Sequence, residues 1–352
     1  MKPVFRRLDR NPDPGPPGRV AAFVPNWIGD AAMCTPALRA LRRRFPETEL
    51  IALGRSSVCA LLEDIPWLDR LITIPARAGL AAMMRLSGDF RLRRHDRAVL
   101  FSHSFRSAAL ARILGARHVL GYARGSRSPL LTQRMQPHRE NNRVVPIYMA
   151  VEYLELVRAW GCEDDGSGLE LHAKPALVEA FRARFRGPGP LVGLAPGAAF
   201  GPSKCWPAER YAAVADALAE RAGAQCVLLT GPGEEATRDA VLGRARTRLA
   251  AYHDGAPSIA LLKAAISQLD VFLGNDSGPR HIAVAFGVPV VCLMGPTSPR
   301  YSSGPYEKGA VLRIDVPCGP CQKPVCATDH RCMTGIAVEQ VVQAALDRLP
   351  SI

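Results

Sequence analysis

Long apolar runs are missing from this sequence of 352 residues. No window approaches about 18 uninterrupted apolar residues, so we expect no membrane-spanning helix. The N-terminus continues from Met1–Arg7 into a proline-rich run instead of an apolar core, which is not the pattern of a secretory signal. The sequence therefore predicts a protein that stays in the cytoplasm.

Acidic residues are scarce in the first half of the chain. Between Arg85 and Arg143 the only acids are Asp89, Asp96 and Glu140, and the formal net charge of the whole chain is +13. This segment predicts a surface that attracts a polyanion, which could be a nucleic acid, an anionic membrane face or a phosphorylated glycolipid. Because aromatic residues are sparse here and no nucleic-acid motif occurs, nucleic acid is the least favoured partner. The alternative is a solvated basic face that reflects an arginine-rich composition.

The composition and length are those of a globular protein with two domains. Hydrophobic residues make up 48% of the chain and charged residues 22%. Apolar runs alternate with helix-forming segments, a rhythm that indicates parallel, doubly wound sheets. We expect a disordered leader over 1–18, a Rossmann-like domain over 19–165, a linker over 166–190 and a second Rossmann-like domain over 191–352.

The pattern also predicts the individual elements of this α/β fold. Strands are expected over 19–24, 50–53, 70–74, 98–101, 191–195, 226–230, 270–274 and 288–294. Helices are expected near 31–44, 57–63, 79–94, 105–114, 144–160 and 338–349.

A strand–turn–helix in the second half is the most informative segment. The run 270–273 reads as a buried strand, and 281–286 reads as a helix that Gly287 ends. Asp276 or Ser277 can cap this helix, and Gly278 allows the backbone to turn sharply. The free N–H groups at the start of such a helix favour phosphate. An ordinary, well-capped connection is equally compatible with this segment alone.

Two further loops favour a nucleotide site. The strand 191–195 runs into the turn at Gly197, and Lys204 follows in a loop of small residues before a helix that begins near Pro207. A third glycine-bearing loop, 231–235, follows the strand 226–230. Open α/β sheets bind ligands beyond the carboxyl ends of their strands, so the three loops together outline a nucleotide cleft.

Asp30 lies at the start of the first predicted helix, after the segment Pro25–Gly29. A carboxylate at this position is commonly a helix cap, which the helix dipole stabilises. If it faces a bound nucleotide, it is also well placed as a general base. Asp30 alone does not separate these two interpretations.

Taken together, three blocks resemble glycosyltransferase family 9, the ADP-heptose:lipopolysaccharide heptosyltransferases. They are Asn26–Asp30, Pro196–Ala198 followed by Lys204-x-Trp206-Pro207, and Asn275–Gly278 with His281. Their order and spacing are more similar to the heptosyltransferase II branch than to heptosyltransferase I. The resemblance covers roughly residues 19 to 349.

The resemblance implies a GT-B fold, two Rossmann-like domains facing across a cleft, and inverting transfer of heptose from ADP-heptose to the inner core of lipopolysaccharide (Kdo-lipid A). It makes Asp30 the general base, Lys204 a phosphate contact, and Gly197, Asp276, Ser277, Gly278 and His281 parts of the donor site. The family's acidic ribose contact would fall near Gly233, where Glu234 or Glu235 could substitute. Arg106, Arg124 and Arg127 are candidates for acceptor contact. Each could instead be a surface arginine that packs its aliphatic stem.

The chain contains no Asp-x-Asp pair. We therefore expect catalysis without a metal, with the helix start and Lys204 neutralising the diphosphate. The basic first domain could contact the acceptor alone or also an anionic membrane face, on the cytoplasmic side of the inner membrane.

Four of the ten cysteines cluster in the C-terminal part of the chain. The spacing of Cys318, Cys321, Cys326 and Cys332 favours a structural zinc site over disulfides in a cytoplasmic protein. An iron–sulfur cluster fits less well, because nothing else indicates redox chemistry. A reduced loop without metal is as compatible with the pattern.

Three other functions compete with this assignment. A family member with another acceptor position or another sugar is the nearest alternative. A nucleotide-dependent oxidoreductase is disfavoured, because the first strand-to-helix turn lacks Gly-x-Gly-x-x-Gly. A non-catalytic nucleotide-sugar-binding protein is disfavoured by the presence of Asp30 beside an intact donor loop.

Overall fold

The computed structural model describes residues 5–7, 15–75, 85, 88, 90–141, 143–185 and 187–350. The chain divides into two compact units, Met1–Glu170 (unit 1) and Leu171–Ile352 (unit 2). The division falls inside the range 166–190 that the sequence predicts as a linker. Arg39 helps to place the division after residue 170. Its guanidinium pairs with Asp165 at 2.7 Å and with Glu170 at 2.9 Å, and so holds the segment up to residue 170 on unit 1.

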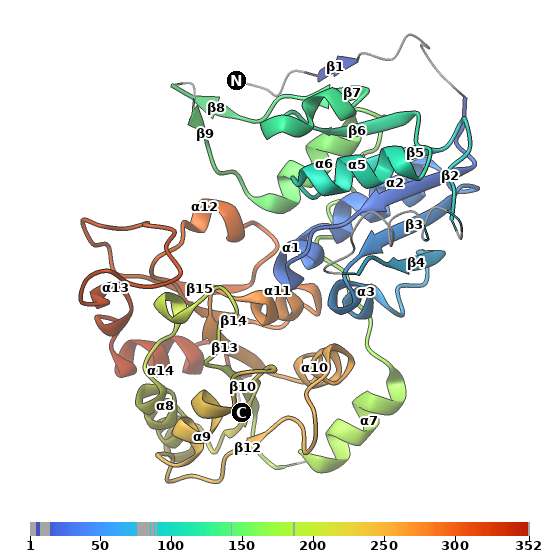
Figure 1. Ribbon diagram of the computed structural model, residues 1–352. Helices are drawn as coiled ribbons and strands as arrows, with labels where there is room; N and C mark the ends of the chain where they lie inside the picture. Colours follow the sequence, from blue (N-terminus) through green and yellow to red (C-terminus); the bar gives the residue numbers. More distant parts are fainter. Residues whose placement is uncertain are drawn as a thin grey trace. The chain divides into compact units, whose positions relative to one another are not determined.

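Unit 1 is built on one twisted sheet with the strand order β1-β7-β6-β5-β2-β3-β4 (Figure 1). The strands β2 to β7 are parallel neighbours, and β1 pairs antiparallel with β7 at the edge. A separate antiparallel pair is formed by β8 and β9. The strands are β1 (Phe5–Arg7), β2 (Arg19–Phe23), β3 (Glu49–Gly54), β4 (Arg70–Thr73), β5 (Arg97–Leu100), β6 (His118–Tyr122), β7 (Gln133–Met135), β8 (Arg139–Glu140) and β9 (Arg143–Val144).

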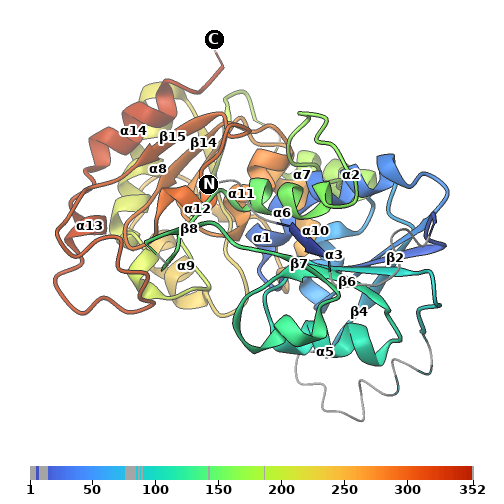
Figure 2. The same ribbon diagram turned by 90° about the horizontal axis from the view of Figure 1, so that it is seen from above.

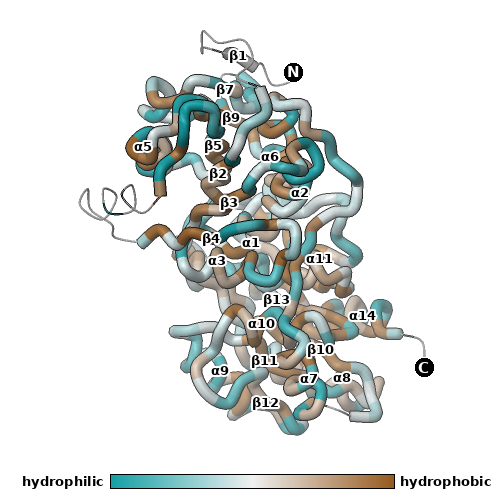
Figure 3. Tube along the Cα trace, turned by 90° about the vertical axis from the view of Figure 1, so that its right-hand side faces the viewer, coloured by the Kyte–Doolittle hydropathy of each residue, from teal (hydrophilic) through white to brown (hydrophobic). Residues whose placement is uncertain are grey.

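Helices cover both faces of this sheet. Figure 2 shows the strands between α5 on one side and α2 and α6 on the other. The helices are α1 (Ile28–Met33), α2 (Thr35–Arg44), α3 (Ser56–Leu62), α5 (Phe105–Ile113), the 3-10 helix η1 (Gly125–Leu130) and α6 (Met149–Arg158). The central strands are apolar and buried, since β2, β3 and β5 pack a common core with Phe23, Ile51 and Leu100, and they carry hydrophobic colour in Figure 3.

Unit 2 repeats the architecture with an all-parallel sheet of order β12-β11-β10-β13-β14-β15. Its strands are β10 (Leu191–Ala195), β11 (Gln225–Leu228), β12 (Ala250–Ala251), β13 (Val271–Asn275), β14 (Val290–Leu293) and β15 (Gly309–Leu312). Its helices are α7 (Pro175–Arg184), η2 (Pro202–Lys204), α8 (Ala208–Ala222), α9 (Glu235–Leu242), α10 (Ile259–Ile266), α11 (Gly278–Ala285), α12 (Pro299–Ser302), α13 (Arg331–Thr334) and α14 (Val338–Leu346). The helices α8, α9 and α14 pack together, and α10 contacts α7 and α11.

The predicted doubly wound α/β fold is confirmed in both units, and the differences have local causes. The expected helix 144–160 begins only at Met149, and Pro146 disfavours helical backbone at Val145, the residue before it. The range 166–190 contains α7, whose Phe181 stacks on Phe185 with ring centroids 4.6 Å apart. Within the expected leader, Phe5–Arg7 forms β1. The helix expected near 79–94 lies mostly outside the described residues.

None of the helices in the part of the chain that the structure describes has both the length and the apolar character needed to span a membrane.

Candidate functional site

The crossing point of the strand order in unit 2 lies between β10 and β13. From β10 the chain proceeds to β11 and β12 on one side, and from β13 it proceeds to β14 and β15 on the other. The loops that leave these two neighbouring strands therefore diverge, which opens a crevice at their carboxyl ends. The loop 196–204 follows β10, and Asp276 and Ser277 follow β13, so the structure brings the predicted donor loops to the same edge of the sheet.

Asn275, the last residue of β13, ties these loops together. Its Nδ2 donates to the carbonyl of Pro196 at 2.7 Å. Its Oδ1 accepts from the backbone N–H of Trp206 at 3.2 Å and from the hydroxyl of Tyr211 at 2.9 Å. Asn275 is fully buried. It is part of the family-like block in the sequence, but its neighbours in space are 64 to 79 residues away and give no local signal.

Lys204 and Asp276 meet at this edge, although 72 residues separate them. The ammonium of Lys204 donates to the backbone carbonyl of Asp276 at 2.7 Å and to its carboxylate at 2.8 Å. An ammonium has three N–H donors, so these contacts leave one for a ligand. The same ammonium lies 5.2 Å from the ring centroid of Phe200.

Asp276 is the centre of a buried charge cluster. Besides Lys204, its carboxylate accepts hydrogen bonds from Arg280 Nη1 at 2.8 Å, Thr297 Oγ1 at 2.6 Å and Ser302 Oγ at 3.0 Å. Arg280 is itself fully buried and also pairs with Glu307 at 2.6 Å. We call Lys204, Asp276, Arg280 and Glu307 the charge cluster. The sequence analysis identified Lys204 and Asp276 but neither Arg280 nor Glu307.

The surroundings of Asp276 keep its carboxylate ionised at neutral pH. Burial alone would raise the pKa of Asp276, but the nearby Lys204 and Arg280 cations outweigh it and hold the pKa well below its usual range. Burial, reinforced by Arg280, lowers the pKa of His281 to about 3. The His281 ring is therefore neutral at pH 7, and the cationic groups near this loop are Lys204 and Arg280.

The helix α11 presents its N-terminus at the same place. Ser277 is its N-cap with extended backbone, but its side chain makes no capping hydrogen bond. Among the described residues, its buried hydroxyl oxygen has no hydrogen-bond partner. The helix begins at Gly278, three residues before the expected start at His281. A helix N-terminus with an unused hydroxyl and an adjacent ammonium is chemically suited to a phosphate.

Glu234 lies beside Gly197 in the neighbouring loop. A Cβ atom on Gly197 would approach the Glu234 carboxyl carbon to 2.0 Å, so the glycine leaves the room that this carboxylate occupies. Glu234 Oε2 accepts from the N–H of Gly231 at 2.7 Å, and burial raises its pKa. Glu235, by contrast, is exposed, and its carboxylate accepts from the N–H of Gly233 at 3.1 Å. Of the two acids considered for the ribose, Glu234 is the one that lies against the loop after β10.

In unit 1 the predicted base Asp30 lies in the first turn of α1, as expected. Its charge acts on two buried neighbours, Cys34 and Tyr153. Burial raises the pKa of both groups, and the Asp30 carboxylate raises each pKa further. Asp30 is thus a partly exposed carboxylate beside the carboxyl end of β2.

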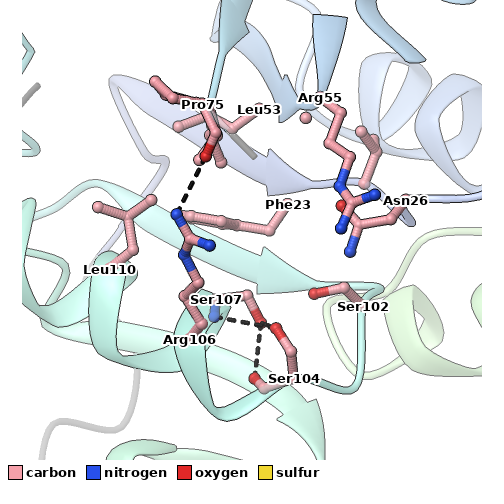
Figure 4. A pocket seen from close by; sticks show the side chains of 13 residues that line it. Phe23, Asn26, Leu53, Arg55, Pro75, Ser102, Ser104, Arg106, Ser107 and Leu110 are labelled. Carbon is pink, nitrogen blue, oxygen red and sulfur yellow. Dashed lines mark hydrogen bonds between the residues drawn. The ribbon is translucent and has the colours of Figure 1, made fainter. Parts of the chain in front are cut away.

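The three arginines expected to contact an acceptor have different surroundings. Arg106, in the first turn of α5, lines a cavity and donates to the carbonyl of Pro75 at 3.0 Å (Figure 4). Arg124 pairs with the buried Glu152 at 2.9 Å. Arg127 is only 1% exposed, and its guanidinium donates to the backbone carbonyls of Tyr122 and Ser102. The prediction for Arg127 does not fit this burial, because its guanidinium donates to the backbone carbonyls at the end of β6 and after β5.

The four clustered cysteines line one small cavity of about 120 Å³ in unit 2, together with His330. Cys332 is buried, and burial raises its pKa, with a further contribution from the other three thiols. His330 is turned to the backbone, with Nε2 2.7 Å from the carbonyl oxygen of Ser203. Within the described residues, no three His, Cys, Asp or Glu side chains are arranged to hold a metal ion.

Two doubly wound sheets, one with a helix N-terminus and a lysine ammonium at its crossing point, define an α/β protein with the architecture of many nucleotide-binding proteins. The model of glycosyltransferase family 9 (heptosyltransferase) matches residues 83–331, more than half of the chain. The chain therefore belongs to glycosyltransferase family 9, as the sequence motifs predicted.

Known relatives agree with this assignment. Over 307 residues the chain is 26% identical to lipopolysaccharide heptosyltransferase 2 of Escherichia coli K12, with 84% of this chain and 88% of the relative covered. The structure of E. coli ADP-heptose LPS heptosyltransferase II is similar with a TM-score of 0.77 and 23% identity, covering 94% of this chain and 98% of that one. E. coli heptosyltransferase WaaC with ADP-2-deoxy-2-fluoro heptose has a TM-score of 0.67 and 16% identity, covering 92% and 99%. The predicted GT-B fold is thereby confirmed.

Proposed function

We propose that this family 9 heptosyltransferase transfers L-glycero-D-manno-heptose from ADP-heptose to the inner core of lipopolysaccharide, as a heptosyltransferase II-like enzyme. The observation that carries the donor part is the charge cluster, which offers Lys204 next to the N-terminus of α11. The relatives named above, one a lipopolysaccharide heptosyltransferase and one an ADP-heptose LPS heptosyltransferase, support the choice of substrates. A cytoplasmic location and contact with an anionic membrane stay predictions from the sequence.

In the proposed reaction, Asp30 accepts the proton of the acceptor hydroxyl as its oxygen attacks the anomeric carbon of the heptose. The bond between that carbon and the diphosphate oxygen breaks on the opposite side, so the configuration inverts and ADP leaves. The departing diphosphate gains negative charge, and positioned donors stabilise it more strongly than they stabilise the intact donor. The remaining N–H of Lys204, the Ser277 hydroxyl and the first N–H groups of α11 are suited to this role.

The same arrangement lets us propose that transfer needs no metal ion. Lys204 and the helix N-terminus supply the positive charge that a divalent cation would otherwise bring to the diphosphate. Asp276 then acts as a positioning residue, because its carboxylate already accepts four side-chain hydrogen bonds and aligns the ammonium of Lys204. Glu234 is our candidate for the ribose contact, since its half-buried carboxylate can accept a hydrogen bond from a sugar hydroxyl.

The test is transfer from ADP-heptose to Kdo-lipid A acceptors with and without the first heptose, in the presence of EDTA. Asp30→Asn should lower turnover by about 10²–10⁴-fold and leave the Kd for ADP-heptose within about twofold, because a general base acts on the acceptor. Glu47→Gln, an exposed carboxylate of the same unit, is the matched control. Full activity of the Asp30→Asn variant would contradict the mechanism.

Lys204→Gln tests the donor site separately. Loss of one charged hydrogen bond to phosphate should weaken ADP binding by about 10–100-fold, measured by calorimetry. Lys308→Gln removes an exposed lysine of the same unit and should leave ADP affinity unchanged. Binding of ADP-heptose without any transfer, under all acceptor conditions, would instead favour a non-catalytic binding protein. Transfer to a different acceptor would keep the family chemistry and change only the substrate.

A further inference from the structure

The loop between β15 and α13 in unit 2 carries a closely spaced pair of thiols. We call residues 316–326 the thiol loop. Within it, Cys318 and Cys321 are separated by Gly319 and Pro320. The C-x-x-C spacing is typical of thiol pairs that convert reversibly between a dithiol and a disulfide. Cys318 is exposed and Cys321 is half-buried, and both are free thiols, so a small reagent in solution can reach the pair.

The three residues that follow this pair are anchored on two other loops of the unit. Gln322 donates its backbone N–H to the carbonyl of Pro296 at 2.9 Å. The carbonyl of Lys323 accepts from the hydroxyl of Ser203 at 2.6 Å. The carbonyl of Pro324 accepts from the backbone N–H of Ser203 at 3.1 Å. The thiol pair therefore directly precedes a stretch that is hydrogen-bonded to two loops outside the thiol loop.

Both of these loops continue into the charge cluster. Ser203 precedes Lys204, whose ammonium bonds the carboxylate of Asp276 at 2.8 Å. Pro296 precedes Thr297, whose hydroxyl donates to the same carboxylate at 2.6 Å. Each anchor is thus one residue away from a side chain that contacts Asp276. A shift of the thiol loop would therefore displace the backbone that positions the Lys204 ammonium.

The space around the pair allows such a shift. Cys318 and Cys321 line a cavity of about 120 Å³ whose wall also includes both anchor residues, Ser203 and Pro296. The two sulfur atoms are not bonded in this structure, whereas a disulfide holds them about 2.05 Å apart. Forming the bond draws the backbone of residues 318–321 together, and the neighbouring anchors must then lengthen or break.

We infer that Cys318 and Cys321 form a reversible disulfide, and that its formation loosens the loop that carries Lys204. The oxidant is a low-molecular-weight disulfide. A thiolate of the pair attacks one sulfur of this reagent and expels the first half of it, which takes up a proton and leaves as a thiol. The second cysteine loses its proton and attacks the mixed disulfide, which expels the other half. The pair loses two electrons, and the reagent becomes two thiols.

The first experiment follows the thiols of the full chain in glutathione buffers, by alkylation and peptide mass spectrometry. Oxidised glutathione should produce a disulfide between Cys318 and Cys321, and dithiothreitol should reverse it. Hydrogen exchange measured on the same samples should be faster at the Ser203 amide in the oxidised chain, because its bond to the Pro324 carbonyl is weakened.

The second experiment measures ADP binding by calorimetry and rests on the proposed function. The oxidised chain should bind ADP about 3–10-fold more weakly than the reduced chain, the effect of weakening one hydrogen bond. The Cys318→Ser/Cys321→Ser variant should bind ADP as the reduced wild type does and should not respond to oxidised glutathione. Cys326→Ser is the matched control, because Cys326 lines the same cavity outside the pair, and it should respond as the wild type does.

Complete alkylation of both thiols after treatment with oxidised glutathione would overturn the inference. A disulfide that leaves the exchange at Ser203 unchanged would overturn it as well. So would a metal ion that the Cys318→Ser/Cys321→Ser variant loses, because the two thiols would then be metal ligands. If the reduced chain binds no ADP, the proposed function fails, whereas the disulfide and the exchange at Ser203 still decide this inference.

Discussion

Replacing Asp276 with asparagine tests whether one carboxylate holds the charge cluster of unit 2 together. The change keeps the size of the side chain but removes its charge, and it presents an amide nitrogen to donors that now bond a carboxylate oxygen. Arg280, which is fully buried, and Lys204 would lose their shared counter-charge. Breaking a buried ion pair by removing one partner costs about 3–5 kcal/mol, because the remaining charge stays desolvated.

That magnitude predicts a clear thermal effect. For a domain of 150–250 residues, each kcal/mol shifts Tm by about 2–4 °C, so unit 2 of Asp276→Asn should melt about 6–20 °C below the wild type in calorimetry. Asp315→Asn is the matched control, since Asp315 also pairs with an arginine, Arg313, at 2.9 Å, but its side chain is 93% exposed. This variant should melt within about 2 °C of the wild type, as surface substitutions do.

The pH dependence has a definite sign. The pKa of Asp276 is lower in the folded protein than its ordinary value of 3.8. A lowered pKa contributes stability that is fully present above the ordinary pKa and is lost as the pH falls toward the folded-state pKa. The wild type should therefore lose stability below about pH 4 more steeply than Asp276→Asn. Equal melting temperatures for the Asp276→Asn and Asp315→Asn variants at pH 7 would refute the reasoning.

Three further predictions follow from individual side chains. Arg127→Gln should lower the free energy of unfolding by about 1–3 kcal/mol in urea, because buried carbonyls of Tyr122 and Ser102 lose donors; an unchanged midpoint would contradict a structural role. The His281 imidazole should stay neutral from pH 8 down to about pH 4 in an NMR titration, since burial lowers its pKa to about 3; titration near pH 6.5 would contradict this. Elemental analysis tests the structural zinc that the cysteine spacing predicts: one zinc per chain, lost in a Cys318→Ser/Cys321→Ser variant, would support it, and metal-free active protein would refute it.

Local sequence patterns were sufficient to predict the strands and helix starts whose apolar residues are buried in the core. The strands β10 and β13 are continuous buried apolar runs between turn residues, and their positions agree with the prediction to within one residue. Pro207 indicated the start of α8, and the capping residues after β13 indicated the start of α11. Because ligand loops in such sheets follow the strands, the positions of Lys204, Ser277 and Gly278 could be predicted with them.

Contacts between residues far apart in the chain could not be predicted from one sequence. Nothing near Arg280 indicates that its guanidinium is buried against Glu307, which lies 27 residues further on. Arg127 looked like one more exposed arginine of a basic segment, yet two backbone carbonyls and the fold around η1 bury it. The strands β6, β7, β12 and β15 were not predicted, because three of them are short or partly exposed and their register depends on neighbouring strands.

The amide of Asn275 has a consequence for how this enzyme tolerates change. Its oxygen receives two donors and its nitrogen serves a carbonyl, so the two ends of the group are not interchangeable. An aspartate there would place a negative charge against the Pro196 carbonyl. A leucine would remove the acceptor that the Tyr211 hydroxyl and the Trp206 N–H now use. Asn275 thus sets the spacing between the loop after β10 and the loop after β13, which we propose to bind the diphosphate. Deamidation of Asn275 would introduce the same negative charge and would therefore destabilise this edge of the sheet.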